Sequence, residues 1–427
     1  MQGLFVVLAF LALFVLGFPV VLAIGIPCIV YMFAHGLPME LVAQRTLYAL
    51  DSFPLVAVPV FLFVGSLMNS AGISRYIYRF ADTATGRLPG GLAQVNIFGS
   101  LIFAGMSGSA LADIGGLGRI EIDAMRDKGF KPAFAAAVTS ASAIVGPIFP
   151  PSIPLIIYGT VTGVSVIQLL LGGIVPALLC VAMLMLTTGW LATRRNYPRA
   201  PRGPTRAELW RDFKPAFPAI MAPVILIAGM LAGFFTPTEI AAVTVLYAIL
   251  ISSLFYRELT WAGVVRAAFE TIRASAGILL IVAVAALFGW ILSVEQVPQR
   301  LTSLMLSISS NPYTLLLIVN LLLLIVGMFL DSTTAILVIA PIIAKPLVAA
   351  GVDPVHLGMV VVFNLMVGLL TPPMGLALFL VADIAKVTMK DVLREMLPYY
   401  VPLIVTLLLI TYVPALTTWI PRLAVGP

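Results

Sequence analysis

Charged residues are scarce in this sequence. Aspartate, glutamate, lysine and arginine together make up 10% of its 427 residues, whereas 61% are hydrophobic. A globule of this size in water needs far more polar surface than this composition provides, so a water-soluble protein is excluded. Apolar stretches of about 20 residues, the length that crosses a bilayer core of ~30 Å, recur along the whole chain. The composition therefore predicts an all-α polytopic membrane protein.

Cysteine and histidine are almost absent. Cys28 and Cys180 lie in apolar segments without a CxxC partner, which argues against a disulfide framework or a zinc site. The two histidines, His35 and His356, fall far apart in the predicted topology, so the chain lacks the nucleophile and base, or the metal cluster, of an intramembrane enzyme. No lysine follows a glycine, which excludes a P-loop. We therefore expect no enzyme activity and no cofactor other than coupling ions.

Apolar runs and their polar breaks predict nine membrane spans. They are residues 4–33, 53–70, 131–161, 168–192, 216–233, 238–256, 274–293, 354–383 and 398–420. The first span is about twice as long as the core of a signal peptide and lacks its basic flank. We expect it to cross the membrane once in the mature protein.

Two further apolar regions, 92–127 and 313–349, are each cut near the middle by small polar residues. The interruptions are Ser107-Gly108-Ser109 and Asp331-Ser332-Thr333-Thr334. The halves are too short to cross, which predicts two re-entrant helical hairpins. Such hairpins are tolerated at membrane depth only where protein or a watery cavity covers their tips.

The basic residues indicate the orientation. If each hairpin begins and ends on one face, 20 of the 24 lysines and arginines fall on one side, and the other side holds only Arg45, Arg300, Lys345 and Arg422. Lysine and arginine collect in cytoplasmic loops, so we expect a cytoplasmic N-terminus and a periplasmic C-terminus. These basic residues lie in short loops rather than in a patch with interleaved aromatics, which argues against a nucleic-acid partner.

The predicted topology contains an internal repeat. Residues 1–192 run through span, span, hairpin, broken span and span, and residues 238–427 repeat this order from the opposite face, with 193–237 as a cytoplasmic linker and connecting span. Ser107 precedes Pro150-Pro151 by 43 residues, and Ser332 precedes Pro372-Pro373 by 40. Inverted repeats with discontinuous helices are typical of secondary transporters, whose site lies at the repeat interface near the midplane.

The first candidate site combines the hairpin tip MSGSALAD (106–113) with the interruption GPIFPPSIP (146–154) of broken span 131–161. The prolines remove backbone donors and force the helix to unwind, leaving carbonyl groups that suit a cation. The hairpin turn offers amide and hydroxyl groups at a helix N-terminus, which suit a carboxylate. An anion and a cation can therefore bind side by side.

The second candidate site repeats this pattern with MFLDSTTAILVIAP (328–341) and GLLTPPMGLALFL (368–380), the latter inside broken span 354–383. Asp331 is either a coupling-ion ligand or the N-cap of the helix that begins at Ser332, and the two roles are compatible. A purely structural interpretation also stands, because small residues serve helix packing and a Pro-Pro pair can be only a kink. The occurrence of both elements at matched positions favours binding.

Three polar residues near the interruptions are further candidates. Asp113, Asn96 and Asn364 either contribute ligands or only satisfy the hairpin backbone. The segment FTPTEIAAV (235–243) is typical of a helix start, because Thr236 and Pro237 are followed by Thr238 and Glu239 as an acidic first turn. A role in binding is the alternative.

Taken together, these motifs resemble the large membrane subunit of tripartite ATP-independent periplasmic (TRAP) transporters, the DctM-like permeases. The resemblance covers the whole chain, and its strongest stretches are 106–118, 134–159, 235–243, 328–341 and 368–380. It implies an elevator-type fold in the bacterial inner membrane, a separate small subunit of four helices, and a periplasmic solute-binding protein. It also implies sodium-driven import of a small organic acid, such as a dicarboxylate or sialic acid.

The resemblance also implies the residues of the sites. Sodium should be held by Ser107, Gly146 and Pro150 in the first half, and by Asp331, Ser332, Gly368 and Thr371 in the second. The substrate should contact Ser109 and Thr333 at the hairpin tips.

Other transport mechanisms stay open at this point. A cation/carboxylate symporter that needs no binding protein is the nearest alternative, and an ATP-driven permease with a separate ATPase subunit is another. The identity of the acid is not encoded here, because hydroxyl, amide and carbonyl groups recognise an acid group without selecting one acid.

Overall fold

The computed structural model describes residues 2–199, 203–309 and 311–426, and these residues form helices, turns and loops without a strand. The first half contains α1 (Gln2–Val15), α2 (Val20–Ala34), α3 (Glu40–Leu50), α4 (Phe53–Ser70), α5 (Ser74–Thr85), α6 (Leu92–Ser107), α7 (Ala110–Asp113), the π-helix η1 (Ile114–Gly118), α8 (Arg119–Asp127), α9 (Pro132–Ala143), α10 (Ile153–Thr162), α11 (Val166–Gly172) and α12 (Ile174–Arg194).

The second half has a corresponding series of helices. It contains α13 (Arg206–Leu231), α14 (Pro237–Leu250), the π-helix η2 (Ile251–Phe255), α15 (Trp261–Val294), α16 (Val297–Ile308), α17 (Pro312–Phe329), α18 (Ser332–Ala349), α19 (Pro354–Leu369), α20 (Leu376–Ala385), α21 (Met389–Tyr412) and α22 (Ala415–Val425). Within the described residues, eight helical stretches are long and apolar enough to cross a membrane. The predicted all-α polytopic class is therefore confirmed.

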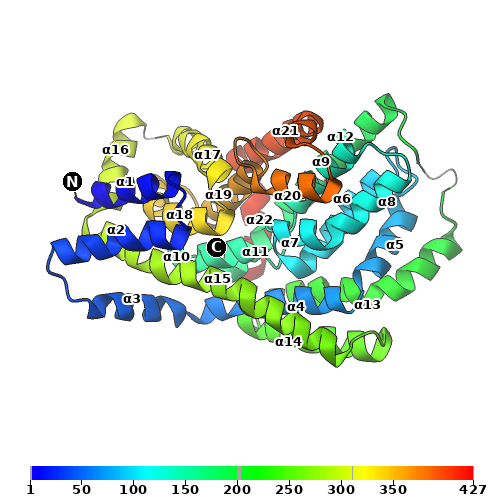
Figure 1. Cartoon of the computed structure of the whole chain (residues 1–427), viewed down its shortest axis with the longest axis horizontal. Helices are drawn as coiled ribbons and strands as arrows, with labels where there is room; N and C mark the ends of the chain where they lie inside the picture. Colours follow the sequence, from blue (N-terminus) through cyan, green and yellow to red (C-terminus); the bar gives the residue numbers. More distant parts are fainter. Residues whose placement is uncertain (1, 200–202, 310, 427) are drawn as a thin grey trace.

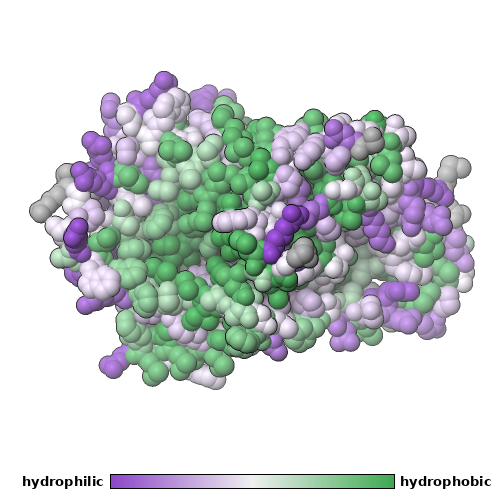
Figure 2. All heavy atoms as spheres, turned by 180° about the vertical axis from the view of Figure 1, so that it is seen from behind, coloured by the Kyte–Doolittle hydropathy of each residue, from purple (hydrophilic) through white to green (hydrophobic). Residues whose placement is uncertain are grey.

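The surface agrees with a membrane environment. On the face shown in Figure 2, hydrophobic side chains cover much of the middle, and hydrophilic side chains gather toward the two ends. Exposed apolar residues are spread over many helices, including Phe33 on α2, Leu186 on α12 and Leu321 on α17. Such side chains need lipid or a protein partner around them.

The prediction of a single span over 4–33 is wrong. The chain turns at Gly17, whose φ of +86° suits glycine, and α1 and α2 pack side by side as a helix pair (Figure 1). The backbone N–H of Gly3 and the hydroxyl of Tyr31 both donate to the carboxylate of Glu295, at 3.1 and 2.8 Å. Gly3 thus lies at the same end of the pair as Tyr31, and the cytoplasmic N-terminus inferred from one crossing loses its basis.

Two groups of helices surround the helix breaks and the hairpin tips. The outer group consists of α2, α3, α4, α14 and α15, in which α15 packs on α2, α3 and α4, and α4 packs on α14. Helices α3, α4, α14 and α15 run along the lower edge of Figure 1. The hairpin group consists of α6 to α10 with η1, and α17 to α20. Helices of the two groups meet where α15 packs on α18 and where α4 packs on α6 and α10.

Both predicted broken spans are interrupted where the prolines stand. The first is divided into α9 and α10 by residues 144–152, and the second into α19 and α20 by residues 370–375. The first half of each lies in the protein core: every side chain from Phe134 to Ala143 and from Val355 to Leu369 is buried. The small residues of α9 allow neighbouring helices to approach closely.

The expectation that all hairpin arms are too short to cross is wrong for the second hairpin. Its arms, α17 and α18, have 18 residues each and meet the length of a membrane span. Its tip nevertheless contacts the break of the second broken helix, since the N–H of Gly375 lies 3.4 Å from the carbonyl oxygen of Met328. Each half of the molecule also packs into the other, because α10 lies on α18 and α20 lies on α8 and α9.

Candidate functional site

The first hairpin tip lies against the first helix break. Helix α6 ends at the buried Ser107, and Gly108 follows with φ of +61°. A Cβ at Gly108 would come within 2.6 Å of the Pro151 carbonyl oxygen, and the N–H of Ile153 donates to the Gly108 carbonyl at 3.4 Å. The absence of a side chain at Gly108 therefore lets the tip backbone contact the interrupted helix directly.

Helix starts at this junction are capped by serine. The hydroxyl oxygen of Ser109 accepts from the Ala112 N–H at 3.5 Å at the start of α7, and the Ser152 hydroxyl oxygen accepts from the Leu155 N–H at 3.2 Å at the start of α10. The Ser152 hydroxyl also donates to the Pro147 carbonyl. Two helix N-termini, with their partial positive charge, therefore begin beside the tip.

Asp113 is the most unusual residue of this site. Its side chain is buried, and neither carboxylate oxygen has a hydrogen-bond partner among the described residues. A Cβ at Gly146 would lie 2.6 Å from Asp113 Oδ2, so the carboxylate contacts the helix break through the space that glycine leaves. An unpartnered carboxylate inside a protein is costly unless a proton or a cation joins it. The structure thus gives Asp113 more weight than the motif pattern did.

The residues that follow Asp113 are a sequence signal for this position. The glycine-rich run Ile114–Gly118 directly after it forms the π-helix η1, and single π-turns inside helices occur often at functional sites. An acidic residue in an apolar hairpin, followed by this run, marks a position of interest.

The second hairpin tip is built around Asp331. Its Oδ2 accepts from the N–H groups of Thr333 and Thr334 at 3.0 and 3.2 Å, and the Thr334 hydroxyl donates to Oδ1. Asp331 is therefore the N-cap of α18, one of the two roles considered for it. Ser332 and Thr333 are half-buried in the first turn of the helix.

The second helix break approaches this tip by backbone contact. A Cβ at Gly368 would lie 2.6 Å from the Gly327 Cα. The Thr371 hydroxyl donates to the Val367 carbonyl at 2.7 Å, and the Tyr400 hydroxyl donates to the Leu370 carbonyl. The hairpin tip that holds Asp331 therefore meets the helix break that holds Gly368 and Thr371. In the first half, the tip that holds Ser107 meets the break that holds Gly146 and Pro150.

Asn96 and Asn364 connect hairpin arms to broken helices. The Ser142 hydroxyl donates to Asn96 Oδ1 at 2.7 Å, and Asn96 Nδ2 donates to the Thr139 hydroxyl oxygen at 2.7 Å. In the second half, Asn364 Nδ2 donates to Asn320 Oδ1 at 2.8 Å. Ser142 and Asn364 each stand eight residues before the Pro-Pro pair of their half. Both contacts fix a hairpin arm on its broken helix.

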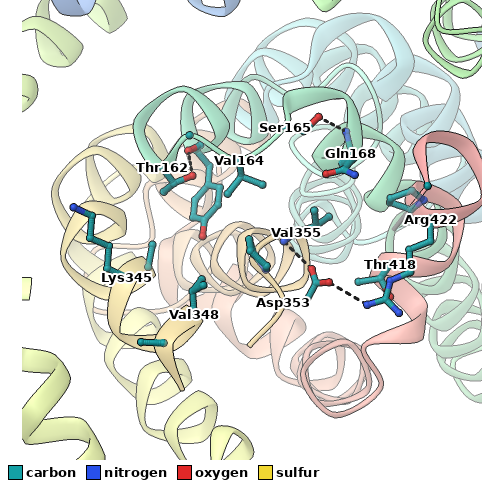
Figure 3. A pocket seen from close by; sticks show the side chains of 17 residues that line it. Thr162, Val164, Ser165, Gln168, Lys345, Val348, Asp353, Val355, Thr418 and Arg422 are labelled. Atoms are coloured by element: carbon teal, nitrogen blue, oxygen red, sulfur yellow. Dashed lines mark hydrogen bonds and ion pairs between the residues drawn. The ribbon is translucent and has the colours of Figure 1, made fainter. Parts of the chain in front are cut away.

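Two cavities open away from the hairpin tips. The α22 cavity, of about 690 Å³, lies among α10, α18, α19 and α22, and the Asp353 carboxylate pairs there with Arg422 at 3.1 Å (Figure 3). The α3–α18 cavity, of about 600 Å³, lies between α3 and α15 on one wall and α10 and α18 on the other. Its walls therefore come from both the outer group and the hairpin group.

A transition-metal site finds no support in the described part of the chain. No group of three histidine, cysteine, aspartate or glutamate side chains is placed to hold a metal ion there. Carbonyl, hydroxyl and single carboxylate oxygens at the two junctions are of the kind that hard cations prefer.

The fold and the two junctions define a polytopic membrane protein with a transporter fold. A solved structure, "Crystal structure of the Alcanivorax borkumensis YdaH transporter reveals an unusual topology", matches 87% of this chain and 88% of its own chain with a TM-score of 0.65. The sequences are 16% identical, so this likeness concerns the fold alone.

Sequence comparisons identify the family. Residues 5–416 match the family described as "Tripartite ATP-independent periplasmic transporter, DctM component", and the chain belongs to this family of large permeases. It is 44% identical to the sialic acid TRAP transporter large permease protein SiaM of Vibrio cholerae, over 90% of each chain. It is 38% identical to the sialic acid TRAP transporter permease protein SiaT of Haemophilus influenzae, over 98% of this chain and 68% of that longer protein. The resemblance stated from the motifs is confirmed.

Proposed function

We propose that this permease is the membrane part of a sodium-coupled importer of a small organic acid that depends on a solute-binding protein. The observation that carries the proposal is the pair of hairpin tips seated on proline-broken helices, with the unpartnered Asp113 carboxylate at one of them. Buried ionisable groups in membrane segments are generally functional, and interrupted helices at matched positions are the usual place of transporter sites.

The sodium sites would be formed by the residues at the two junctions. Ser107, Gly146 and Pro150 would hold one ion, with Asp113 as the nearby negative charge. Asp331, Ser332, Gly368 and Thr371 would hold the other. A sodium ion fits the first site because the two Asp113 carboxylate oxygens there complete no hydrogen bond and would be balanced by the ion.

The acid would be bound at the hairpin tips. Ser109 caps α7 and Thr333 stands in the first turn of α18, so both offer amides and hydroxyls of helix N-termini to a carboxylate. We propose sialic acid or a related carboxylate, including dicarboxylates, as substrate, because the relatives named above are sialic acid permeases.

An elevator movement is the proposed conformational step. The hairpin group holds both junctions, and the outer group covers it from one edge. Movement of the hairpin group against the outer group would carry the sites across the membrane without dismantling them. The small membrane subunit would be a separate chain of four helices, and the solute-binding protein would dock from the periplasm.

We place the loops that carry most of the basic residues in the cytoplasm of a bacterial inner membrane, and the C-terminus in the periplasm. The α1–α2 pair puts Gly3 beside Tyr31 and Glu295, at the end that holds His35. That end lies outside in the same topology, so we propose that the N-terminal residues are periplasmic rather than cytoplasmic.

Reconstitution in liposomes tests the proposal. Purified permease, small subunit and solute-binding protein are combined, and uptake of labelled N-acetylneuraminate and succinate is measured with and without an inward sodium gradient. We expect uptake that needs all three proteins and stops when a sodium ionophore is added. Unchanged uptake without the binding protein would instead support the binding-protein-independent symporter. Uptake without a sodium gradient would refute sodium coupling.

A further inference from the structure

The α3–α18 cavity has basic side chains on both walls. Arg45 on α3 lies on the wall formed by the outer group, and Lys345 on α18 lies on the wall formed by the hairpin group. Tyr48, Trp290 and Ser293 add aromatic and hydroxyl groups to the first wall, and Thr160 adds a hydroxyl to the second. A cavity of this size with a few converging polar groups is typical of a small-molecule site.

Neither basic residue is neutralised by an acidic side chain in the part of the chain that the structure describes. The Arg45 Nε is buried and has no hydrogen-bond partner, and its guanidinium lies over the Trp290 ring at 5.1 Å from the ring centre. Neither Arg45 nor Lys345 forms an ion pair within the described residues. Asp51, the acidic residue of this cavity, pairs with neither of them. The cavity therefore has two unpaired cations against one carboxylate.

The neighbouring α22 cavity differs, because its arginine forms an ion pair. Its Arg422 is paired with Asp353, and Lys345, which lines both cavities, extends away from the middle of the α22 cavity (Figure 3). Lys345 is thus a cation without an ion pair that lines the α3–α18 cavity together with Arg45. An arginine fork held on an aromatic ring is well suited to a carboxylate.

We propose that the α3–α18 cavity is a second binding site for the transported organic acid, in which Arg45 and Lys345 hold its carboxylate before it reaches the hairpin tips. This inference rests on the proposed function, because it takes the transported acid as its ligand. No residue of the hairpin tips lines this cavity, so the site is separate from the two junctions. Bound anion would join the two walls, and movement of the hairpin group relative to α3 would pull Lys345 away from Arg45 and release it.

Uptake kinetics test the assignment. In the reconstituted three-protein system, Arg45→Gln and Lys345→Gln should each raise the N-acetylneuraminate concentration for half-maximal uptake about tenfold, since a charge-assisted hydrogen bond is lost. The maximal rate should change little. Arg45→Lys should restore part of the loss because it keeps the charge. Arg300→Gln is the matched control, since Arg300 is an exposed basic residue on α16 outside the cavity.

Thiol labelling gives a second measurement that does not depend on transport. The native cysteines Cys28 and Cys180 are buried, so an introduced cysteine dominates the reaction. N-Acetylneuraminate should slow the labelling of Ser293→Cys in the cavity but not that of Ser303→Cys, which is exposed on α16. The protection should disappear when Arg45→Gln is added.

The outcomes separate this inference from the proposed function. If the unmutated system takes up no organic acid, the proposed function fails. If it takes up acid normally but Arg45→Gln and Lys345→Gln behave like Arg300→Gln, the second site is refuted. Labelling of Ser293→Cys that N-acetylneuraminate does not slow refutes it as well, even where the uptake kinetics change.

Discussion

Gly368 at the end of α19 packs directly on Gly327 near the tip of the second hairpin. A Cβ on Gly368 would lie 2.6 Å from the Gly327 Cα, and a Cβ on Gly327 would lie 3.0 Å from the Gly368 Cα. These atoms belong to two backbones, which cannot move aside as a flexible side chain can. The pair therefore sets how closely the hairpin tip approaches the helix break.

Substitution of this pair should separate the tip from the break. We expect Gly368→Ala to destabilise the protein by about 1–3 kcal/mol, as overpacking of a tight contact does, and to abolish most sodium-driven uptake. Thermal unfolding in detergent and uptake in liposomes measure the two effects. Gly277→Ala on α15 is the control, because a Cβ there meets no atom within 4 Å; a comparable loss in that variant would contradict the explanation.

Asp113 should determine the sodium dependence of uptake. Asp113→Asn keeps the shape of the side chain but removes the charge from the first junction, so the sodium concentration for half-maximal uptake should rise about tenfold, equivalent to roughly 1.4 kcal/mol. Titration of uptake against sodium measures this change. The control is Asp123→Asn on α8, where the carboxylate pairs with Arg126 at 48% exposure. An unchanged sodium titration in the Asp113 variant would leave its unpartnered oxygens without a role in coupling.

Two substitutions of Asp331 distinguish its possible roles. Asparagine caps a helix about as well as aspartate does, whereas alanine costs about 1 kcal/mol. If Asp331 is only the N-cap of α18, Asp331→Asn should behave like the unmutated protein and Asp331→Ala should be less stable. If its charge also holds sodium, both variants should need more sodium for uptake. Sodium titrations and melting curves of the two variants together decide between these roles.

Glu295 should anchor the α1–α2 pair in a pH-dependent manner. The Tyr31 hydroxyl and the Gly3 N–H donate to its carboxylate and hold the pKa of Glu295 below its ordinary value of 4.5, although partial burial opposes this. A lowered pKa in the folded state means that the stabilisation is present in full above pH 4.5 and is lost as the pH falls through the lowered pKa.

The corresponding variant is Glu295→Gln. It should lower the melting temperature of the detergent-solubilised protein at pH 7. The difference in melting temperature between the variant and the unmutated protein should become smaller below pH 4.5. Glu270→Gln on the exposed side of α15 serves as the control. A difference in melting temperature that stays constant from pH 7 into the acid range would show that the carboxylate charge does not anchor the helix pair.

Local residue type and hydropathy were sufficient to predict much of the structure of this protein. Lipid as the solvent, the positions of the hairpin tips at Ser107 and Asp331, and the helix breaks at the Pro-Pro pairs all follow from residue type and spacing. These features depend on backbone hydrogen bonding within a short segment, because two adjacent prolines remove two donors from one turn. Single prolines such as Pro27 in α2 and Pro341 in α18 stay inside a helix. The same local signal was insufficient at residues 4–33, where the turn at Gly17 divides one apolar run into two packed helices.

Only the tertiary structure decided which groups stand without partners and which meet across the chain. Asp113 is unusual because its buried carboxylate completes no hydrogen bond among the described residues, although the Ser107 hydroxyl lies near it. Arg45 and Lys345 face one cavity although 300 residues separate them. The contact of Gly327 with Gly368 is likewise invisible in a hydropathy profile. Such relationships depend on the packing of helices distant in sequence, and apolar composition drives burial without specifying which helices pack together.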